Sequence, residues 1–328
     1  MKFCDREVAI RKMNGYGNQR KPFFFLVSFD ESECLVLSPD EVSPDDLLYD
    51  FPQATNVGGK RCLVRKRIQW ESFPEPFDVY QKSFEVVRRN LYAGNSFLVN
   101  LTCATSVQTN YSLEEIFGCS EARYKLLLKN RFVCFSPETF VRIQDGWVYS
   151  YPMKGTIDAA IPHARDILLC DEKEATEHAT ITDLIRNDLS RIATQVSVTR
   201  YKYIEELHTH GGALLQMSSE IRGKLPDGYR DRLGDMFFSL LPAGSITGAP
   251  KRKTVEIIEE AENYQRRFYT GVAGFFDGTN LDSAVLIRFL EVMPDGNMLF
   301  KSGGGITFRS DARSEYEEMK QKVYVPID

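Results

Sequence analysis

A glutamate and a lysine are predicted to lie together at the open end of one β-hairpin in the middle of the chain. The segment 136–156 contains two runs of β-branched and aromatic residues separated by an Asp-Gly pair, which is typical of a tight hairpin turn. Folding about this turn places Glu138 opposite Met153 and therefore close to Lys154. A carboxyl group beside an amine can act as a proton donor beside a nucleophile. A solvated ion pair at the end of an edge strand is the alternative.

Two predicted helices each carry a pair of glutamates three residues apart. Glu174 and Glu177 form one pair, and Glu315 and Glu318 form the other. Side chains at this spacing share one face of a helix, and like charges stacked in this way destabilise it. Carboxylate oxygens are the ligands that Mg²⁺ prefers, so a divalent cation between the two helices would offset the repulsion. A solvated acidic face with Lys173 nearby is the other interpretation.

Composition and charge narrow the class of protein. The 328 residues are 43% apolar and 27% charged, with a net charge of −5 and dispersed Lys and Arg, so we expect no nucleic-acid partner. The longest apolar run, 23–27, is too short to span a membrane, and residues 1–10 are charged throughout, so we do not expect them to act as a signal peptide. The seven cysteines contain no C-x-x-C motif, which predicts free thiols and a cytoplasmic location.

The hydrophobic pattern predicts strands and helices in one mixed fold. Strands are expected over 22–29, 34–37, 96–105, 196–203, 214–221 and 298–302, with a second hairpin over 268–292. Helices are expected over 77–93, 113–128, 172–193, 233–241, 252–263 and 312–322. Residues 1–17 are expected to be irregular, and 42–50 to be a short helix or a loop.

Three further features could line a ligand site. The loop 242–251 consists of small residues without the spacing of a phosphate-binding loop, so it can close on a compact ligand. Asn100 is an amide inside an apolar strand and is either a hydrogen-bonded core residue or a site residue. Tyr269 and Arg288 occupy roughly opposed positions of the second hairpin.

Several of these stretches occur together, in one order along the chain: PMKGT (152–156), EKEATEHATITDLIRNDLSR (172–191), PAGSITGAPK (242–251), Tyr269-Thr270-Gly271, GGGI (303–306) and SEYEEMKQK (314–322). This set resembles the chorismate-utilising enzymes, and within them most closely aminodeoxychorismate synthase component I. The resemblance covers about residues 75–328. It implies an α+β fold in which two large antiparallel β-sheets pack face to face with helices on the outside. Residues 75–328 would form the chorismate-binding catalytic domain, and 1–74 a shortened N-terminal segment that adds strands to the same fold.

The resemblance also implies roles for the acidic residues and the hairpin. Glu177 and Glu318 would bind Mg²⁺, with Glu174 and Glu315 around it through water, and the ion would hold the ring carboxylate of chorismate. Lys154 would add covalently to C2 of chorismate as the C4 hydroxyl leaves. The residues that would contact substrate or act on it are Lys154, Glu138 as general acid, Gly155, Thr156, Ser245, Tyr269, Arg288, Gly303, Gly305 and Lys322.

Three positions distinguish the chemistries of this family. Leu98 stands where isochorismate and salicylate synthases have a water-activating lysine, which argues against water as the nucleophile. Gln216 stands in the segment where anthranilate synthases have a histidine that assists pyruvate loss, which favours retention of the enolpyruvyl group. Asn100 would line the ammonia route.

The resemblance therefore implies a Mg²⁺-dependent aminodeoxychorismate synthase component I. Because no glutaminase domain is recognisable, ammonia would come from a glutamine amidotransferase partner or from solution. The alternatives are anthranilate synthase component I, or a catalytically silent subunit that docks an amidotransferase.

Overall fold

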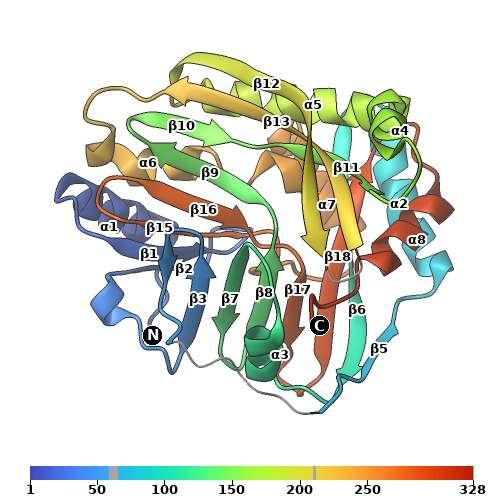
Figure 1. Cartoon of the computed structure of the whole chain (residues 1–328), viewed down its shortest axis with the longest axis horizontal. Helices are drawn as coiled ribbons and strands as arrows, with labels where there is room; N and C mark the ends of the chain where they lie inside the picture. Colours follow the sequence, from blue (N-terminus) through green and yellow to red (C-terminus); the bar gives the residue numbers. More distant parts are fainter. Residues whose placement is uncertain (59–65, 210–211, 328) are drawn as a thin grey trace.

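Two antiparallel β-sheets form the centre of the molecule (Figure 1). The computed structural model describes residues 1–58, 66–209 and 212–327. Within these residues sheet A has nine strands, with β12 (Thr194–Thr209) paired to β13 and the others in the order β11 (Met153–Asp158), β13 (Gly212–Lys224), β10 (Trp147–Ser150), β9 (Thr139–Gln144), β16 (Leu281–Val285), β15 (Val272–Phe276), β1 (Phe23–Val27) and β2 (Cys34–Leu37). Sheet B, over the same described residues, also has nine, with β5 (Trp70–Phe73) paired to β6 and the others in the order β14 (Gly248–Ala249), β6 (Leu98–Thr109), β18 (Met298–Ile306), β17 (Phe289–Val292), β8 (Phe132–Ser136), β7 (Tyr124–Leu128), β3 (Leu47–Phe51) and β4 (Ala54–Thr55).

Strand β1 shows how the two sheets and the outer helices share the core. Its five residues are all buried, because successive side chains point to opposite faces and both faces are covered. Phe24 points toward sheet B, where its ring lies 4.9 Å from that of Tyr49. Phe25 points the other way, where its ring lies 4.7 Å from that of Phe237 in a helix. The prediction of two sheets packed face to face with helices outside is confirmed.

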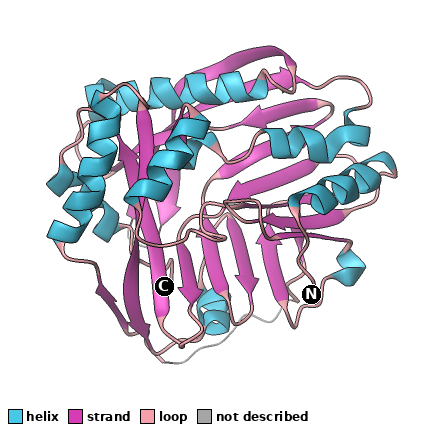
Figure 2. Cartoon of the chain, turned by 180° about the vertical axis from the view of Figure 1, so that it is seen from behind, coloured by secondary structure: helices cyan, strands magenta, loops and turns pink. Residues whose placement is uncertain are grey.

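The helices cover the outer faces of the sheets, as the view from behind shows (Figure 2). Those against sheet A are α1 (Arg6–Asn18), α4 (Ala164–Cys170), α5 (Glu172–Leu189) and α6 (Leu233–Ser239). Those against sheet B are α2 (Phe77–Tyr92), α3 (Leu113–Cys119), α7 (Lys251–Ala261) and α8 (Ala312–Gln321). Three short 3₁₀ helices occur among the described residues, at Pro39–Glu41, Tyr229–Arg232 and Gly244–Ile246. No helix in this part of the chain is long and apolar enough to cross a membrane.

The first residues of the chain form helix α1, so the prediction of an irregular segment is wrong. The Asp5 carboxylate caps the helix by accepting a 2.8 Å hydrogen bond from the Val8 backbone N–H. Ala9 and Met13 are fully buried on its inner face. Gly17 packs directly against the Arg230 carbonyl, where a Cβ would come within 2.3 Å of the oxygen. A glycine that suggests a turn is therefore needed here for close packing.

Two apolar segments were also assigned to the wrong element. Residues 47–51 form strand β3, where a helix or loop was expected, and the helix expected over 113–128 ends at Cys119 and gives way to strand β7. Leu126 and Leu127 of β7 are buried on opposite faces of sheet B. A strand buried on both sides has no alternating pattern, so periodicity alone does not separate it from a buried helix.

The central hairpin forms as β9 and β10 with the predicted register, in which Trp147 lies opposite Gln144. The two arms then separate before they reach Glu138. Strand β9 pairs with β16 on its other edge, while β10 and then β11 follow one edge of β13, whose opposite edge is paired with β12. Met153 is therefore paired with Ser218 and not with Glu138.

The second hairpin forms as β15 and β16 about the predicted turn, with Phe276 opposite Leu281. Its second arm is interrupted at 286–288, and the next strand, β17, belongs to sheet B. The chain thus crosses from one sheet to the other immediately before and at Arg288. No disulfide occurs in the described part of the chain, which contains six of the seven cysteines; Cys62 lies outside it.

Candidate active site

One cavity of about 510 Å³ lies where β11 and α5 from the sheet A side meet β18 and α8 from the sheet B side (Figure 1). Its volume is within the usual range of small-molecule sites. All the residues predicted to form the site line it: Asn100, Glu138, Lys154, Gly155, Thr156, Glu174, Glu177, Ser245, Tyr269, Arg288, Gly303, Gly305, Glu315, Glu318 and Lys322. Segments more than two hundred residues apart in sequence therefore meet in one place.

Strand β11 presents Lys154 to the cavity through an irregularity in its pairing. The register with β13 shifts between Lys154 and Thr156, and Gly155 takes a φ of +69°. A Cβ on Gly155 would also lie 2.8 Å from the Leu168 side chain and 3.2 Å from an oxygen of Glu174. Glycine is required at this bulge both by the backbone conformation and by the space.

Helix α5 is fixed against sheet A by a buried histidine next to Glu177. His178 Nε2 lies 2.7 Å from the Ser219 hydroxyl of β13. Burial lowers the pKa of His178 to about 4, so the ring is neutral and acts as a hydrogen-bonding anchor. Anchoring this side of the helix directs Glu174 and Glu177 toward the cavity.

The acidic residues of α5 and α8 face each other across the cavity and are joined by lysines. Lys173 Nζ lies 3.0 Å from Glu315 on α8 and 3.9 Å from Glu177 on its own helix. Lys154 Nζ lies 3.5 Å from the other oxygen of Glu177. The predicted repulsion within each glutamate pair is thus offset by cations that sit between the two helices.

The second acid of α8 is paired with the lysine one turn further on. Lys322 Nζ lies 2.8 Å from Glu318 and donates a 2.8 Å hydrogen bond to the Gly303 carbonyl. Burial alone would raise the pKa of Glu318, but the charge and hydrogen bond of Lys322 outweigh it and lower that pKa. Burial in turn lowers the pKa of Lys322.

The carboxylates of α5 offer oxygen ligands suited to a metal ion, but fewer than an ion needs. Burial raises the pKa of Glu177, and burial together with the neighbouring Glu177 charge raises the pKa of Glu174. Glu177 Oε1 is buried and receives no hydrogen bond, so it has a lone pair directed at no protein donor. Among the described residues, no three acidic, histidine or cysteine side chains group closely enough to enclose a metal ion by themselves. An ion held here would therefore need oxygen ligands from substrate and water, as Mg²⁺ commonly does.

Glu138 lines the same cavity as Lys154, whose charge lowers the pKa of the Glu138 carboxyl. The Ser245 hydroxyl donates a short hydrogen bond to the Glu138 carboxyl. Burial raises the pKa of Glu138, and the Ser245 hydrogen bond and the charges of Lys154 and Arg288 offset this only in part. The carboxyl group keeps its proton to a higher pH than an ordinary glutamate, as a general acid requires.

Tyr269 and Arg288 line the cavity from the crossover between the sheets. Burial raises the pKa of Tyr269, so its phenol stays protonated and can donate a hydrogen bond. Arg288 has a φ of +56°, and its carbonyl accepts a 3.1 Å hydrogen bond from the Phe135 backbone N–H. A guanidinium beside a phenol is suited to binding a carboxylate.

Two lysines of the cavity wall were not predicted as site residues. Lys173 stands four residues before Glu177, and this helical spacing was a usable signal. Lys301 stands two residues before Gly303 in β18, on the same strand face, and pairs with Glu291 at 2.7 Å. Only the pairing of β17 with β18 brings these last two charges together.

Comparison with known proteins identifies the family. The sequence profile of the chorismate binding enzymes matches residues 63–328. The chain belongs to this family. It is 47% identical to a PabA-like protein of Pasteurella multocida over 318 residues, which are 97% of this chain and 98% of that protein. It is 32% identical to aminodeoxychorismate synthase component 1 of Bacillus subtilis over 269 residues, covering 77% of this chain and 56% of that enzyme.

Two further comparisons concern the sister enzymes. Anthranilate synthase component 1 of Mycobacterium tuberculosis is 37% identical over 195 residues, covering 57% of this chain and 36% of that enzyme. The solved structure of MenF, the menaquinone-specific isochorismate synthase of Escherichia coli, superimposes with a TM-score of 0.73 at 16% identity over 98% of this chain and 82% of that one. At this identity the likeness shows a shared fold, which is that of the chorismate-utilising enzymes.

Proposed function

We propose that this protein is an aminodeoxychorismate synthase component I, which converts chorismate and ammonia to 4-amino-4-deoxychorismate. The observation that carries the proposal is the meeting of Glu138 and Lys154 in one cavity with the four glutamates of α5 and α8. A carboxyl with a raised pKa and an amine that line one cavity can serve as the proton donor and the nucleophile of one substitution reaction. The relative from Bacillus subtilis supports the same reaction class.

In the proposed reaction, two residues of the chain make and break the bonds at the ring. The Lys154 amine adds to C2, the ring double bonds shift, and the C4–O bond breaks while Glu138 gives its proton to the departing hydroxyl, which leaves as water. Ammonia then forms a bond to C4, the double bonds shift back and expel Lys154, and one ammonia proton returns to Glu138. Overall, chorismate and ammonia give the amino product and water.

We further propose that Glu177 and Glu318 bind Mg²⁺, with Glu174 and Glu315 around the ion through water. When bound, the ion would neutralise the ring carboxylate of chorismate and fix its position. The buried Glu177 oxygen without a hydrogen-bond donor supports this assignment. The lysines now neutralise part of the negative charge of these carboxylates. When the ion is bound, it would take over some or all of that neutralisation.

The groups near Lys154 favour ammonia over water as the nucleophile that is added to the ring. Leu98 and the Lys154 amine both lie next to Gly305. A Cβ added to this glycine would be 3.1 Å from the Leu98 side chain and 3.1 Å from Lys154 Nζ. An apolar side chain at this point offers no base to activate water. Asn100, which lines the same cavity, is assigned to the ammonia route.

Retention of the enolpyruvyl group is supported by Gln216. It lines the cavity, and its amide lies 3.5 Å from the Thr156 hydroxyl. A neutral amide does not donate a proton as a histidine does, so pyruvate loss lacks its acid. Tyr269 and Arg288 are assigned to the enolpyruvyl carboxylate, and the remaining contacts to substrate are assigned to Gly155, Thr156, Ser245, Gly303, Gly305 and Lys322.

The protein would act in the cytoplasm with a glutamine amidotransferase that supplies ammonia. The proposal is tested by incubating purified protein with chorismate, MgCl₂ and ammonium and identifying the product by mass. We expect 4-amino-4-deoxychorismate. Fluorescent anthranilate with released pyruvate would instead assign the chain to anthranilate synthase component I, the candidate favoured by the 37% identity to the mycobacterial enzyme.

A third outcome would assign a different role. If no product forms with ammonium, or with a glutaminase and glutamine, while the protein still captures that glutaminase, the chain is a silent subunit that docks an amidotransferase. Measuring chorismate consumption in the same samples separates this outcome from a change of product.

A further inference from the structure

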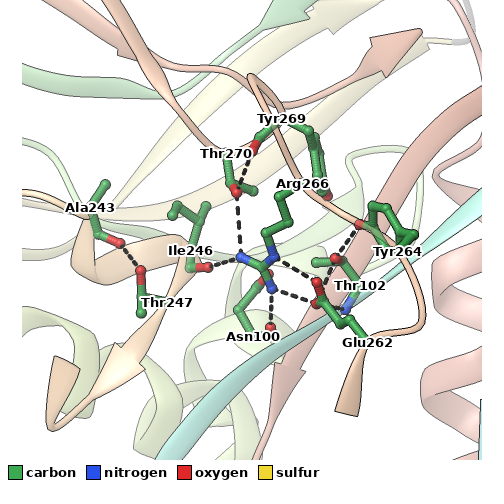
Figure 3. A network of polar contacts seen from close by, with 10 residues as sticks. All are labelled: Asn100, Thr102, Ala243, Ile246, Thr247, Glu262, Tyr264, Arg266, Tyr269 and Thr270. Carbon is green, nitrogen blue, oxygen red and sulfur yellow. Dashed lines mark hydrogen bonds and ion pairs between the residues drawn. The ribbon is translucent and has the colours of Figure 1, made fainter. Parts of the chain in front are cut away.

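A buried arginine behind the cavity wall connects three of the segments that form it. Arg266 is 4% exposed, and all the N–H groups of its guanidinium donate hydrogen bonds (Figure 3). Nη2 donates a 2.6 Å hydrogen bond to the Asn100 carbonyl, and Nη1 donates to the Ile246 carbonyl at 3.0 Å and to the Thr270 hydroxyl at 3.3 Å. One planar group therefore connects strand β6, the 3₁₀ helix Gly244–Ile246 and the turn at 269–271.

Glu262 holds the guanidinium in this orientation. Its two oxygens accept hydrogen bonds from Arg266 Nε at 2.9 Å and from Nη2 at 2.6 Å. The same carboxylate accepts from the Thr102 backbone N–H at 2.9 Å and from its hydroxyl at 2.7 Å, and the Thr102 hydroxyl also lies 2.5 Å from the Tyr264 hydroxyl. The two-point pairing fixes the plane of the arginine, which a single-point contact would not.

The segments held by Arg266 each contribute a residue to the cavity wall. Asn100, Ile246 and Tyr269 line the cavity, and Thr270 follows Tyr269 directly. Neither Arg266 nor Glu262 is among the lining residues. Their effect on a ligand must therefore pass through the groups that they position.

The turn at Thr270 is the part that most needs this support. Thr270 has a φ of +61°, a conformation that a β-branched residue adopts at an energetic cost and that persists only when surrounding contacts enforce it. Its hydroxyl accepts from Arg266 and donates to the Tyr269 carbonyl at 2.6 Å, and its N–H donates to the Leu286 carbonyl at 2.8 Å. These contacts fix the backbone at Tyr269, which lines the cavity. One of them reaches Leu286, two residues before Arg288.

We propose that Arg266, oriented by Glu262, is a positioning residue that sets the spacing of Asn100, Ile246 and Tyr269 around the substrate. The inference rests on the proposed function in that the substrate is taken to be chorismate. It does not depend on which nucleophile or product follows.

The test replaces the planar guanidinium of Arg266 and keeps the positive charge. Arg266→Lys keeps a cation but offers one nitrogen in place of a planar fork, so it cannot reach all the acceptors at once. We expect the Kd for chorismate, measured by calorimetry, and the KM each to rise about tenfold or more, and kcat to fall by a similar factor, since small displacements of positioning groups have effects of this size. Glu262→Gln, which leaves the fork in place but weakens its orientation, should change the same constants less.

The control separates positioning from simple loss of stability. Ile116→Ala opens a cavity in the fully buried core under α3, away from the site, and should lower the melting temperature without altering Kd or KM. A protein that is merely less folded shows a lower apparent kcat with an unchanged KM. If folded Arg266→Lys and Glu262→Gln both keep the wild-type Kd and KM, or follow the pattern of the control, the inference is wrong.

The same experiment distinguishes this inference from the proposed function. Wild-type protein that consumes chorismate but forms no aminated product would overturn the proposed function, while the comparison of chorismate constants would still decide the role of Arg266. Wild-type protein that binds no chorismate would overturn both.

Discussion

The strongest prediction concerns the replacement Glu138→Gln. Glutamine has the shape of glutamate, and its amide oxygen can still accept the hydrogen bond from Ser245, so the cavity wall stays in place. The amide has no proton to transfer, and losing a general acid costs about 10²- to 10⁴-fold in rate. Ser245→Ala keeps the acid and removes its hydrogen bond from Ser245, which is worth about 1 kcal/mol and corresponds to about a fivefold effect. The two variants should therefore differ clearly in kcat.

The direction of the pH dependence follows from the raised pKa of Glu138. The acid is active when protonated, so wild-type kcat should fall on the alkaline side as pH rises through this raised pKa. Because the Ser245 hydrogen bond lowers the pKa of Glu138, Ser245→Ala should move the alkaline limb to higher pH. Glu138→Gln should lose the limb altogether.

Stability should change with pH in a matching way. A carboxyl whose pKa is higher in the folded than in the unfolded protein stabilises the fold below its unfolded pKa, and that contribution is lost as pH rises through the folded pKa. The melting temperature of Glu138→Gln should therefore rise relative to that of wild type with increasing pH. The assay is steady-state chorismate conversion with ammonium from acid to alkaline pH, together with thermal unfolding. Wild-type kcat and an unchanged alkaline limb in Glu138→Gln would refute the acid role.

Three further predictions concern the amine, the metal and the buried charges. Lys154→Ala should lower chorismate conversion by orders of magnitude, while chorismate binding measured by calorimetry stays detectable. The control Lys320→Ala on α8, outside the cavity, should change neither conversion nor binding. Unchanged turnover in Lys154→Ala would rule out the covalent step. Chelation by EDTA should abolish conversion and added Mg²⁺ restore it, with Glu177→Gln needing more Mg²⁺ for half-maximal rate; activity that persists in EDTA would count against the metal. Lys301→Met should cost up to about 3–5 kcal/mol in urea unfolding, because the buried Glu291 loses its close partner and keeps the partly exposed Arg267 at 3.6 Å, and adding Glu291→Met should recover most of the loss. A loss below 1 kcal/mol in the single variant would show that the pair is not the buried interaction described.

The chemistry of the site could be predicted from local patterns in the sequence. The hairpin turn, the two glutamate pairs and the small-residue loop each depend on neighbours within a few residues, and the glutamate pairs and residues of the loop line the cavity. The order of the motifs along the chain predicted the family to which the protein belongs. The roles of the individual residues stay predictions until the experiments above are made.

The errors lie where burial by distant segments overrides local pattern. Helix α1 has two glycines that suggest turns, but its packing against α6 makes helix the stable form. Strand β7 reads as part of a helix because neighbours cover both of its faces. Glu138 and Met153 separate because β9 pairs with β16 and β11 pairs with β13. The local sequence of the hairpin does not indicate that β16 and β13 will be these partners.

The sequence by itself determined which groups can act and which short elements carry them, because turns, helix faces and residue chemistry are local properties of the chain. Only the tertiary structure decided how those groups are combined. The lysine that joins α5 to α8, the shared cavity of Glu138 and Lys154, and the Arg266 guanidinium behind three segments of the cavity wall all bring together residues from separate elements. The physical reason is that burial and charge pairing depend on the distance between atoms in space, which the pairing of whole strands and helices sets.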